Sequence, residues 1–154
     1  MNIIYRSATF DDVEAMHKIL HDYAKAGLML PRARNAIYES LREYVVAEID
    51  GKIVGIGALH FVWDRLAEVR SLAIIPDHKT TGIGRKIVEL LEAEGVARGV
   101  EMFFTLTYQP GFFGKCGYEV VAKESLSPKV WKECVHCPQY PNCDEIALTK
   151  IVKK

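Results

Sequence analysis

The stretch from Glu68 to Arg85, EVRSLAIIPDHKTTGIGR, constrains the fold of this chain more than any other part of the sequence. An apolar run stops at Pro76, and the loop after it ends in Gly82-Ile83-Gly84. Apolar residues then recur at helical spacing to about Arg98, so the pattern predicts a strand, a glycine loop and a helix. The first turn of a helix offers unpartnered N–H groups and a positive dipole end, and glycine lets an anion approach closely. The sequence therefore predicts a phosphate-binding loop.

This loop lacks the residues of two common phosphate-binding motifs. A Walker loop has a glycine followed, after four residues, by Gly-Lys-Ser/Thr; here Asp77 stands five places before Gly82, and Arg85 follows Gly84. A dinucleotide fingerprint needs a small residue three places after Gly84, where Ile87 stands. The sequence thus disfavours ATP, GTP, NAD and FAD as ligands.

Length and charge narrow the class of protein. The chain has 154 residues, of which 49% are hydrophobic, and no repeat or low-complexity linker divides it, so we expect a single domain over residues 1–154. Lys plus Arg and Asp plus Glu each number 20, so no basic field favours nucleic acid or an anionic membrane as partner. No stretch approaches the roughly 20 apolar residues of a membrane span, and the start does not resemble a signal peptide. We expect a cytoplasmic protein with small-molecule partners.

Local patterns predict the other elements. Strands are expected at 2–6, 44–49, 53–62, 66–75, 102–106 and 118–121, with Asp50-Gly51 as a hairpin turn. Helices are expected after a capping box at Thr9 and Asp12, after Asn35 as a cap, after the glycine loop, and at 110–116. An antiparallel meander followed by a parallel crossover around the long helix gives an α+β, or mixed α/β, fold.

The glycine loop resembles the acetyl-CoA loop of the GCN5-related N-acetyltransferase (GNAT) superfamily, whose pattern Gln/Arg-x-x-Gly-x-Gly/Ala lies over residues 79–84. The resemblance extends over nearly the whole chain. It implies a central, mostly antiparallel sheet with one splayed parallel pair of strands and flanking helices, and acetyl-CoA as co-substrate. Lys79 departs from the pattern, because it keeps a donor but loses planar geometry. The resemblance implies cofactor contacts from Leu72, Ala73, Ile74, Lys79, Thr80, Thr81, Gly82, Ile83, Gly84, Arg85 and Phe113.

Acyl transfer to an amine needs a base for the amine and tight positioning of both reactants. The resemblance implies that Glu68 is the general base, acting directly or through water. Many relatives place a proton-donating tyrosine where this chain has Phe113, so either Tyr108 or solvent protonates the departing thiolate. We favour solvent, because a thiol of pKa about 8.5 leaves with little help. Cys116 has no histidine near it in sequence, so we expect a packed cysteine and direct transfer without an acyl-enzyme.

Two further segments resemble the short, stand-alone N-acetylglutamate synthases of arginine biosynthesis. They are LMLPR at 28–32 and the segment from Pro128 to Glu145. This resemblance implies L-glutamate as the acceptor of the acetyl group. Glutamate has two carboxylates, and the planar guanidinium groups of Arg32 and Arg70 suit bidentate capture of such groups. The expected substrate-binding residues are Leu30, Arg32, Arg70 and Ser71.

Several alternatives stay open. The acceptor could be another small amine such as glutamine, or the chain could be a CoA-binding regulatory module without turnover; a homodimer is also open. Cys134, Cys137 and Cys143, with His136 between them, offer soft ligands for zinc, but this spacing supplies half of an ordinary site. We therefore predict free thiols and no metal. His60 and His78 are isolated in the sequence, and we expect them to be structural or exposed.

Overall fold

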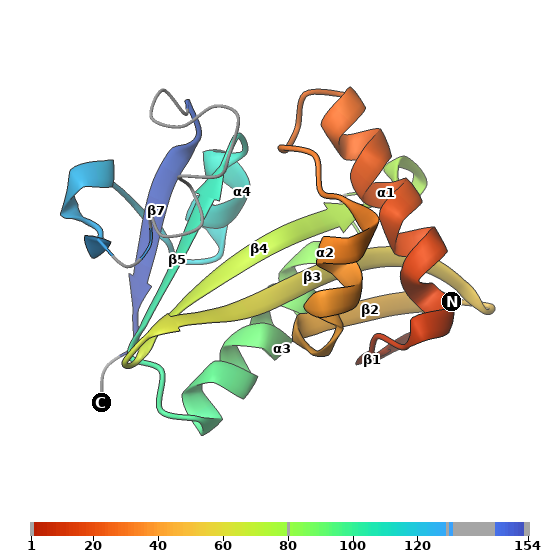
Figure 1. The fold of residues 1–154 in the computed structure, drawn as a ribbon, viewed down its shortest axis with the longest axis horizontal. Helices are drawn as coiled ribbons and strands as arrows, with labels where there is room; N and C mark the ends of the chain where they lie inside the picture. Colours follow the sequence, from red (N-terminus) through yellow and green to blue (C-terminus); the bar gives the residue numbers. More distant parts are fainter. Residues whose placement is uncertain (1, 80, 129, 131–143, 153–154) are drawn as a thin grey trace.

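The computed structural model describes residues 2–79, 81–128, 130 and 144–152, and its centre is a seven-stranded sheet of order β1-β2-β3-β4-β5-β7-β6 (Figure 1). The strands are β1 (Ile3–Ser7), β2 (Tyr44–Ile49), β3 (Lys52–Trp63), β4 (Leu66–Ile74), β5 (Met102–Thr107), β6 (Glu119–Val121) and β7 (Ile146–Ile151). The α-helices in the described part are α1 (Val13–Lys25), α2 (Arg34–Glu39), α3 (Ile83–Ala97) and α4 (Pro110–Lys115). Single 3-10 turns are η1 (Phe10–Asp12), η2 (Leu41–Glu43), η3 (Pro76–His78) and η4 (Lys123–Ser125).

The sheet is antiparallel except at one pair of strands. β4 and β5 run parallel, and they pair only where Leu66, Ala67 and Glu68 face 102–104. β4 continues to Ile74 and β5 to Thr107 without further mutual pairing in the described residues. Figure 1 shows the two strands diverging from their common start. The expected fold class, with its splayed parallel pair, is confirmed.

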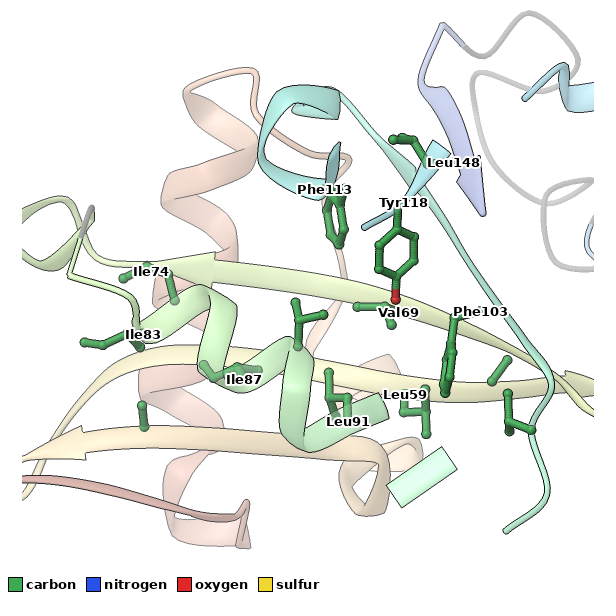
Figure 2. Packing of buried hydrophobic residues seen from close by; sticks show 14 of the residues in the cluster. Leu59, Val69, Ile74, Ile83, Ile87, Leu91, Phe103, Phe113, Tyr118 and Leu148 are labelled. Atoms are coloured by element: carbon green, nitrogen blue, oxygen red, sulfur yellow. The ribbon is translucent and has the colours of Figure 1, made fainter. Parts of the chain in front are cut away.

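Helices cover both faces of this sheet. α1 buries Val13, Met16, Leu20 and Tyr23 against the face that α2 also covers (Figure 1), as their helical spacing predicts. α3 covers the opposite face. Figure 2 shows its residues packed with residues of β3, β4 and β5, namely Ile83, Ile87 and Leu91 with Leu59, Val69 and Phe103. Full burial of such side chains contributes about 1.5–3 kcal/mol each, so this packing fixes α3 and the loop before it.

A small residue in β3 lets α3 approach the sheet. A Cβ on Gly57 would lie 2.7 Å from Cγ2 of Ile87 and 3.3 Å from Cδ1 of Leu72. A larger residue at position 57 would push α3 outward. The start of α3 is therefore held beside the end of β4, where the glycine loop connects them.

An ion pair fixes the start of α1. The Thr9 N–H donates to Oδ2 of Asp12 at 2.7 Å, which confirms the expected capping box. Arg6 donates to both carboxylate oxygens of Asp12, at 2.7 and 2.9 Å, and lowers the pKa of that carboxyl to about 2. The Arg6–Asp12 ion pair therefore links β1 to the start of α1.

Two expectations about the elements were incomplete. α2 begins at Arg34 after extended Ala33, so the expected role of Asn35 as its cap was wrong. No element was expected at 146–151, where the structure has β7 paired with β5 and β6. This strand depends on partners that are distant in the sequence, and its own six residues gave no sufficient local signal.

Candidate active site

Two hollows meet where β4 and β5 diverge. The first, called here the β4–β5 pocket, is lined by Leu28, Met29, Leu30, Arg32, Glu68, Val69, Arg70, Ser71, Leu72, Thr105, Leu106, Thr107, Gln109, Phe113 and Glu145. The second, called the α3 groove, is lined by Tyr23, Leu72, Ile74, His78, Lys79, Gly82, Gly84, Arg85, Gln109, Gly111, Phe112 and Lys115. Leu72 and Gln109 belong to both. A ligand can therefore extend from one hollow into the other.

Backbone geometry builds the phosphate end of the α3 groove. Gly82 is the N-terminal cap of α3 and has a left-handed φ of +85°, which glycine adopts without strain. Gly84 is buried, and a Cβ there would lie 3.2 Å from Cζ of Phe112. Lys79, Arg85 and Lys115 line the same groove, so cationic side chains add to the positive end of the helix dipole. This end suits a polyphosphate.

The structure brings most of the expected cofactor residues together. Those lining the α3 groove are Leu72, Ile74, Lys79, Gly82, Gly84 and Arg85. Phe113 lines the β4–β5 pocket instead, and the side chains of Ala73 and Ile83 are buried in the two cores. The Thr81 hydroxyl donates to the carbonyl of His78 and closes the loop. Thr80 lies outside the described residues.

The end of β4 has a side-chain partner that the sequence did not suggest. The Tyr23 hydroxyl donates to the Ile74 carbonyl at 2.9 Å and accepts the Ile74 N–H at 2.9 Å. Helical spacing placed Tyr23 in the core but gave no indication of this contact.

A network of charges surrounds the expected general base. Nη1 of Arg70 lies 3.7 Å from Oε1 of Glu68, and Nη2 lies 3.3 Å from Oε1 of Glu43. The other oxygen of Glu43 lies 2.7 Å from Nδ1 of His60, which faces Glu68 in the β3–β4 register. The Arg70 side chain is only 10% exposed. Arg70 is therefore held among carboxylates, and His60, which was expected to be structural or exposed, contacts one of them.

Arg32 differs from Arg70. It lies in the loop between α1 and α2, half-buried, and lines the β4–β5 pocket together with Leu30. No ion pair to Arg32 is present among residues 2–79, 81–128, 130 and 144–152. Its guanidinium is thus available to an anion that enters the pocket.

Ser71 gives β4 an irregular shape. Its φ of +58° is unusual for a residue other than glycine, and the β3–β4 register shifts at this point. Its Oγ accepts a hydrogen bond from the Tyr44 hydroxyl at 3.3 Å. The bulge re-aims the side chains between Arg70 and Leu72 where the pocket and the groove join.

Tyr108 and Cys116 lie outside both hollows. The Tyr108 hydroxyl donates to Oδ1 of Asp144 at 2.7 Å. Burial, and next the charge of Glu92, raise the pKa of the Cys116 thiol, so this cysteine stays protonated near neutral pH. Cys134, Cys137 and Cys143 lie outside the described residues.

Sequence reasoning missed several polar residues of the pocket. Thr105 and Thr107 alternate along β5, and this period of two could have placed them on one face. Gln109 follows β5, and its N–H donates to the Thr107 hydroxyl at 2.9 Å. Glu145 precedes β7, a strand that was not expected; it ends the segment that resembles the synthases, but it was not singled out as a site residue.

The chain belongs to the acetyltransferase (GNAT) family, because the sequence model of that family matches residues 11–118. It is an acetyltransferase. The chain is 40% identical over 145 residues to an uncharacterized N-acetyltransferase of Chlorobaculum tepidum, and the match covers 94% of each chain. It is 33% identical over 135 residues to an amino-acid acetyltransferase of Mycobacterium tuberculosis, covering 84% of this chain and 76% of that one.

Solved structures of other proteins share the fold of this chain. A Mycobacterium tuberculosis protein in complex with CoA superposes with a TM-score of 0.84 at 27% identity, covering 97% of this chain and 99% of that one. The N-acetylglutamate synthase of Neisseria gonorrhoeae, complexed with coenzyme A and N-acetyl-glutamate, gives 0.89 at 18% identity. The match covers this chain entirely and 36% of that synthase, and because the identity is only 18% the likeness shows the fold alone. In the described part, no helix is long and apolar enough to cross a membrane.

Proposed function

We propose that this chain transfers the acetyl group of acetyl-CoA to the α-amino group of L-glutamate, the first step of arginine biosynthesis. The observation that carries the proposal is the junction of the two hollows at Leu72 and Gln109. It connects a groove suited to a polyphosphate with a pocket that presents a carboxylate, Glu68, and an available guanidinium, Arg32. The amino-acid acetyltransferase relative supports an amino acid as the acceptor.

The cofactor would lie along the α3 groove. The residues from Gly82 to Arg85, with Lys79 and Thr81, hold the pyrophosphate at the start of α3. The pantetheine arm follows the open edge of β4 at Leu72 and Ile74 toward the β4–β5 pocket. Its thioester then reaches the junction, next to the acceptor.

Glu68 would act as the general base. It takes a proton from the ammonium group of the substrate, directly or through water, and the neutral amine attacks the thioester carbonyl. The C–S bond breaks as the amide forms, the attacking nitrogen releases its second proton to solvent, and the CoA thiolate takes a proton from solvent. Tyr108, whose hydroxyl already donates to Asp144, is the alternative donor. Arg70, between Glu68 and Glu43, orients the Glu68 carboxylate.

Arg32 would hold a substrate carboxylate through two parallel hydrogen bonds. Leu30 and Ser71 complete the pocket beside it. The engagement of Arg70 leaves one available arginine for the two carboxylates of glutamate. This favours, as a second candidate, an acceptor with one carboxylate such as glutamine, whose amide could bond to Thr107 or Gln109.

Thiol release from acetyl-CoA, measured separately with each amino acid, tests the proposal. We expect the highest kcat/KM with L-glutamate. A preference for glutamine would select the second candidate, and release with an amine that lacks a carboxylate would remove the role of Arg32.

A further inference from the structure

The open edge of β4 ends at a pair of backbone groups that a side chain occupies. The Ile75 N–H donates to the Val54 carbonyl of β3 at 2.9 Å. Backbone groups alternate in direction along a strand, so those of Ile74 point away from β3. At this outer edge the Tyr23 hydroxyl bonds to both groups, each at 2.9 Å. One hydroxyl thus donates and accepts as an added strand would.

Tyr23 also holds a cation of the phosphate end. It reaches the edge from α1, is 7% exposed, and lines the α3 groove beside Leu72 and Ile74. Nζ of Lys79 lies 4.7 Å from the centroid of the Tyr23 ring, within the range of a cation–π contact. The Tyr23 hydroxyl therefore occupies the Ile74 backbone at the strand edge, and the Tyr23 ring holds the Lys79 ammonium group of the glycine loop. Both of these groups face the groove.

We propose that Tyr23 competes with the pantetheine arm of acetyl-CoA for the backbone of Ile74 and thereby sets the affinity for the cofactor. This inference rests on the cofactor position given under the proposed function. The arm carries two amides, and each can bond to a strand edge as a peptide does. On binding, the two amides of the arm replace the hydroxyl as partners of the Ile74 N–H and C=O, and Lys79 leaves the ring for the phosphates.

The arrangement has a physical reason in the ligand-free protein. Buried backbone N–H and C=O groups are costly when they have no partner. Tyr23 satisfies both Ile74 groups while the groove is empty, which stabilises the ligand-free fold. Because these bonds must be broken when the arm binds, the same contact weakens cofactor binding.

The Tyr23→Phe variant tests this competition, because it removes the hydroxyl and keeps the ring beside Lys79. We expect calorimetric titration to show CoA binding tightened by about 3- to 10-fold, the range that one net hydrogen bond supplies. The melting temperature of the ligand-free variant should fall. Adenosine 3′,5′-bisphosphate, which has no arm, should bind with unchanged affinity. Tyr38→Phe, at a tyrosine that is 45% exposed on α2, is the matched control and should change neither ligand.

Unchanged or weaker CoA binding by a folded Tyr23→Phe protein would overturn the proposal. Equal tightening for CoA and the bisphosphate would also overturn it, since the effect would then arise at the phosphates. If the unaltered chain bound no CoA, the proposed function would fail instead. A crystal structure of the unaltered chain with CoA gives an independent check: the hydroxyl should have left Ile74, and two retained bonds would contradict the competition.

Discussion

The two ends of the candidate site are built from different chemical groups: one from the backbone and the other from side chains. The phosphate end depends on backbone conformation, with Gly82 in the left-handed region and the first turn of α3 facing the groove. The acceptor end depends on side chains from separate elements, with Arg70 of β4 between Glu68 and Glu43 of η2. The first end is local in the sequence, and the second exists only after the sheet has formed.

This difference determines what a substitution does at each end. A backbone site tolerates changes that leave the turn intact and fails when the turn is strained. A side-chain network transmits a change to every partner. Variants at each end distinguish these two behaviours.

Gly82→Val should abolish measurable acetyl-CoA binding, because a β-branched residue resists a φ of +85° and the turn must change. Gly84→Val should do the same by displacing Phe112. Calorimetric titration measures both. Gly51→Val is the matched control, since Gly51 has a φ of +79° and equal open space but lies in the β2–β3 hairpin. Unchanged affinity in a folded Gly82→Val protein would contradict the phosphate position.

Glu68→Gln should lower kcat at neutral pH by on the order of 10²-fold and leave acetyl-CoA binding nearly unchanged. Raising the pH should restore part of the rate, because a larger fraction of the amine is then already neutral. The pH–rate profile is the measurement. Glu94→Gln, at a carboxylate of α3 outside both hollows, is the control. An unaltered profile in Glu68→Gln would remove Glu68 as the base.

Arg32→Lys should raise KM for glutamate by about 10- to 100-fold, since losing part of a charge-assisted pair costs about 1.5–3 kcal/mol. The KM for acetyl-CoA should stay nearly constant. Arg70→Lys should instead lower kcat and the melting temperature, because its guanidinium holds Glu68 and Glu43. Steady-state kinetics on the two variants is the measurement. The same change in glutamate KM in both would contradict the different roles of Arg32 and Arg70.

Cys116→Ser should have the smallest effect, with kcat nearly unchanged. The raised pKa keeps this thiol protonated near neutral pH, and Cys116 lies outside both hollows. Intact-protein mass spectrometry after mixing with acetyl-CoA should show no acetyl adduct at this residue. An adduct that forms and decays at the rate of turnover would replace direct transfer with an acyl-enzyme.

Sequence reasoning predicted the secondary structure of the phosphate end well. Pro76, Gly82 and Gly84 have backbone requirements that leave a local signature, and the strand, loop and α3 were confirmed. The fold class and most elements followed from hydrophobic periodicity and the Asp50-Gly51 turn. These features depend on residues that are near one another in the chain.

The acceptor end could be predicted only in part. The sequence pointed to Glu68, Arg70 and Arg32 but not to which arginine is engaged, because Glu43 is 27 positions from Arg70. The contact between Tyr23 and Ile74 spans 51 positions. Such pairings depend on the packing of α1, η2 and the sheet, and no periodicity within one element contains them.

A competition experiment measures the preference for the acceptor and the role of Arg32 together. The chain is mixed with acetyl-CoA and all common amino acids at equal concentration, and the acetylated products are quantified by mass spectrometry at early times. Product ratios then equal the ratios of kcat/KM. N-acetylglutamate should dominate in the unaltered chain and lose its lead in Arg32→Lys. Dominance of another acetylated amino acid would rule out glutamate as the preferred acceptor, and an N-acetylglutamate share that Arg32→Lys leaves unchanged would rule out the role of Arg32.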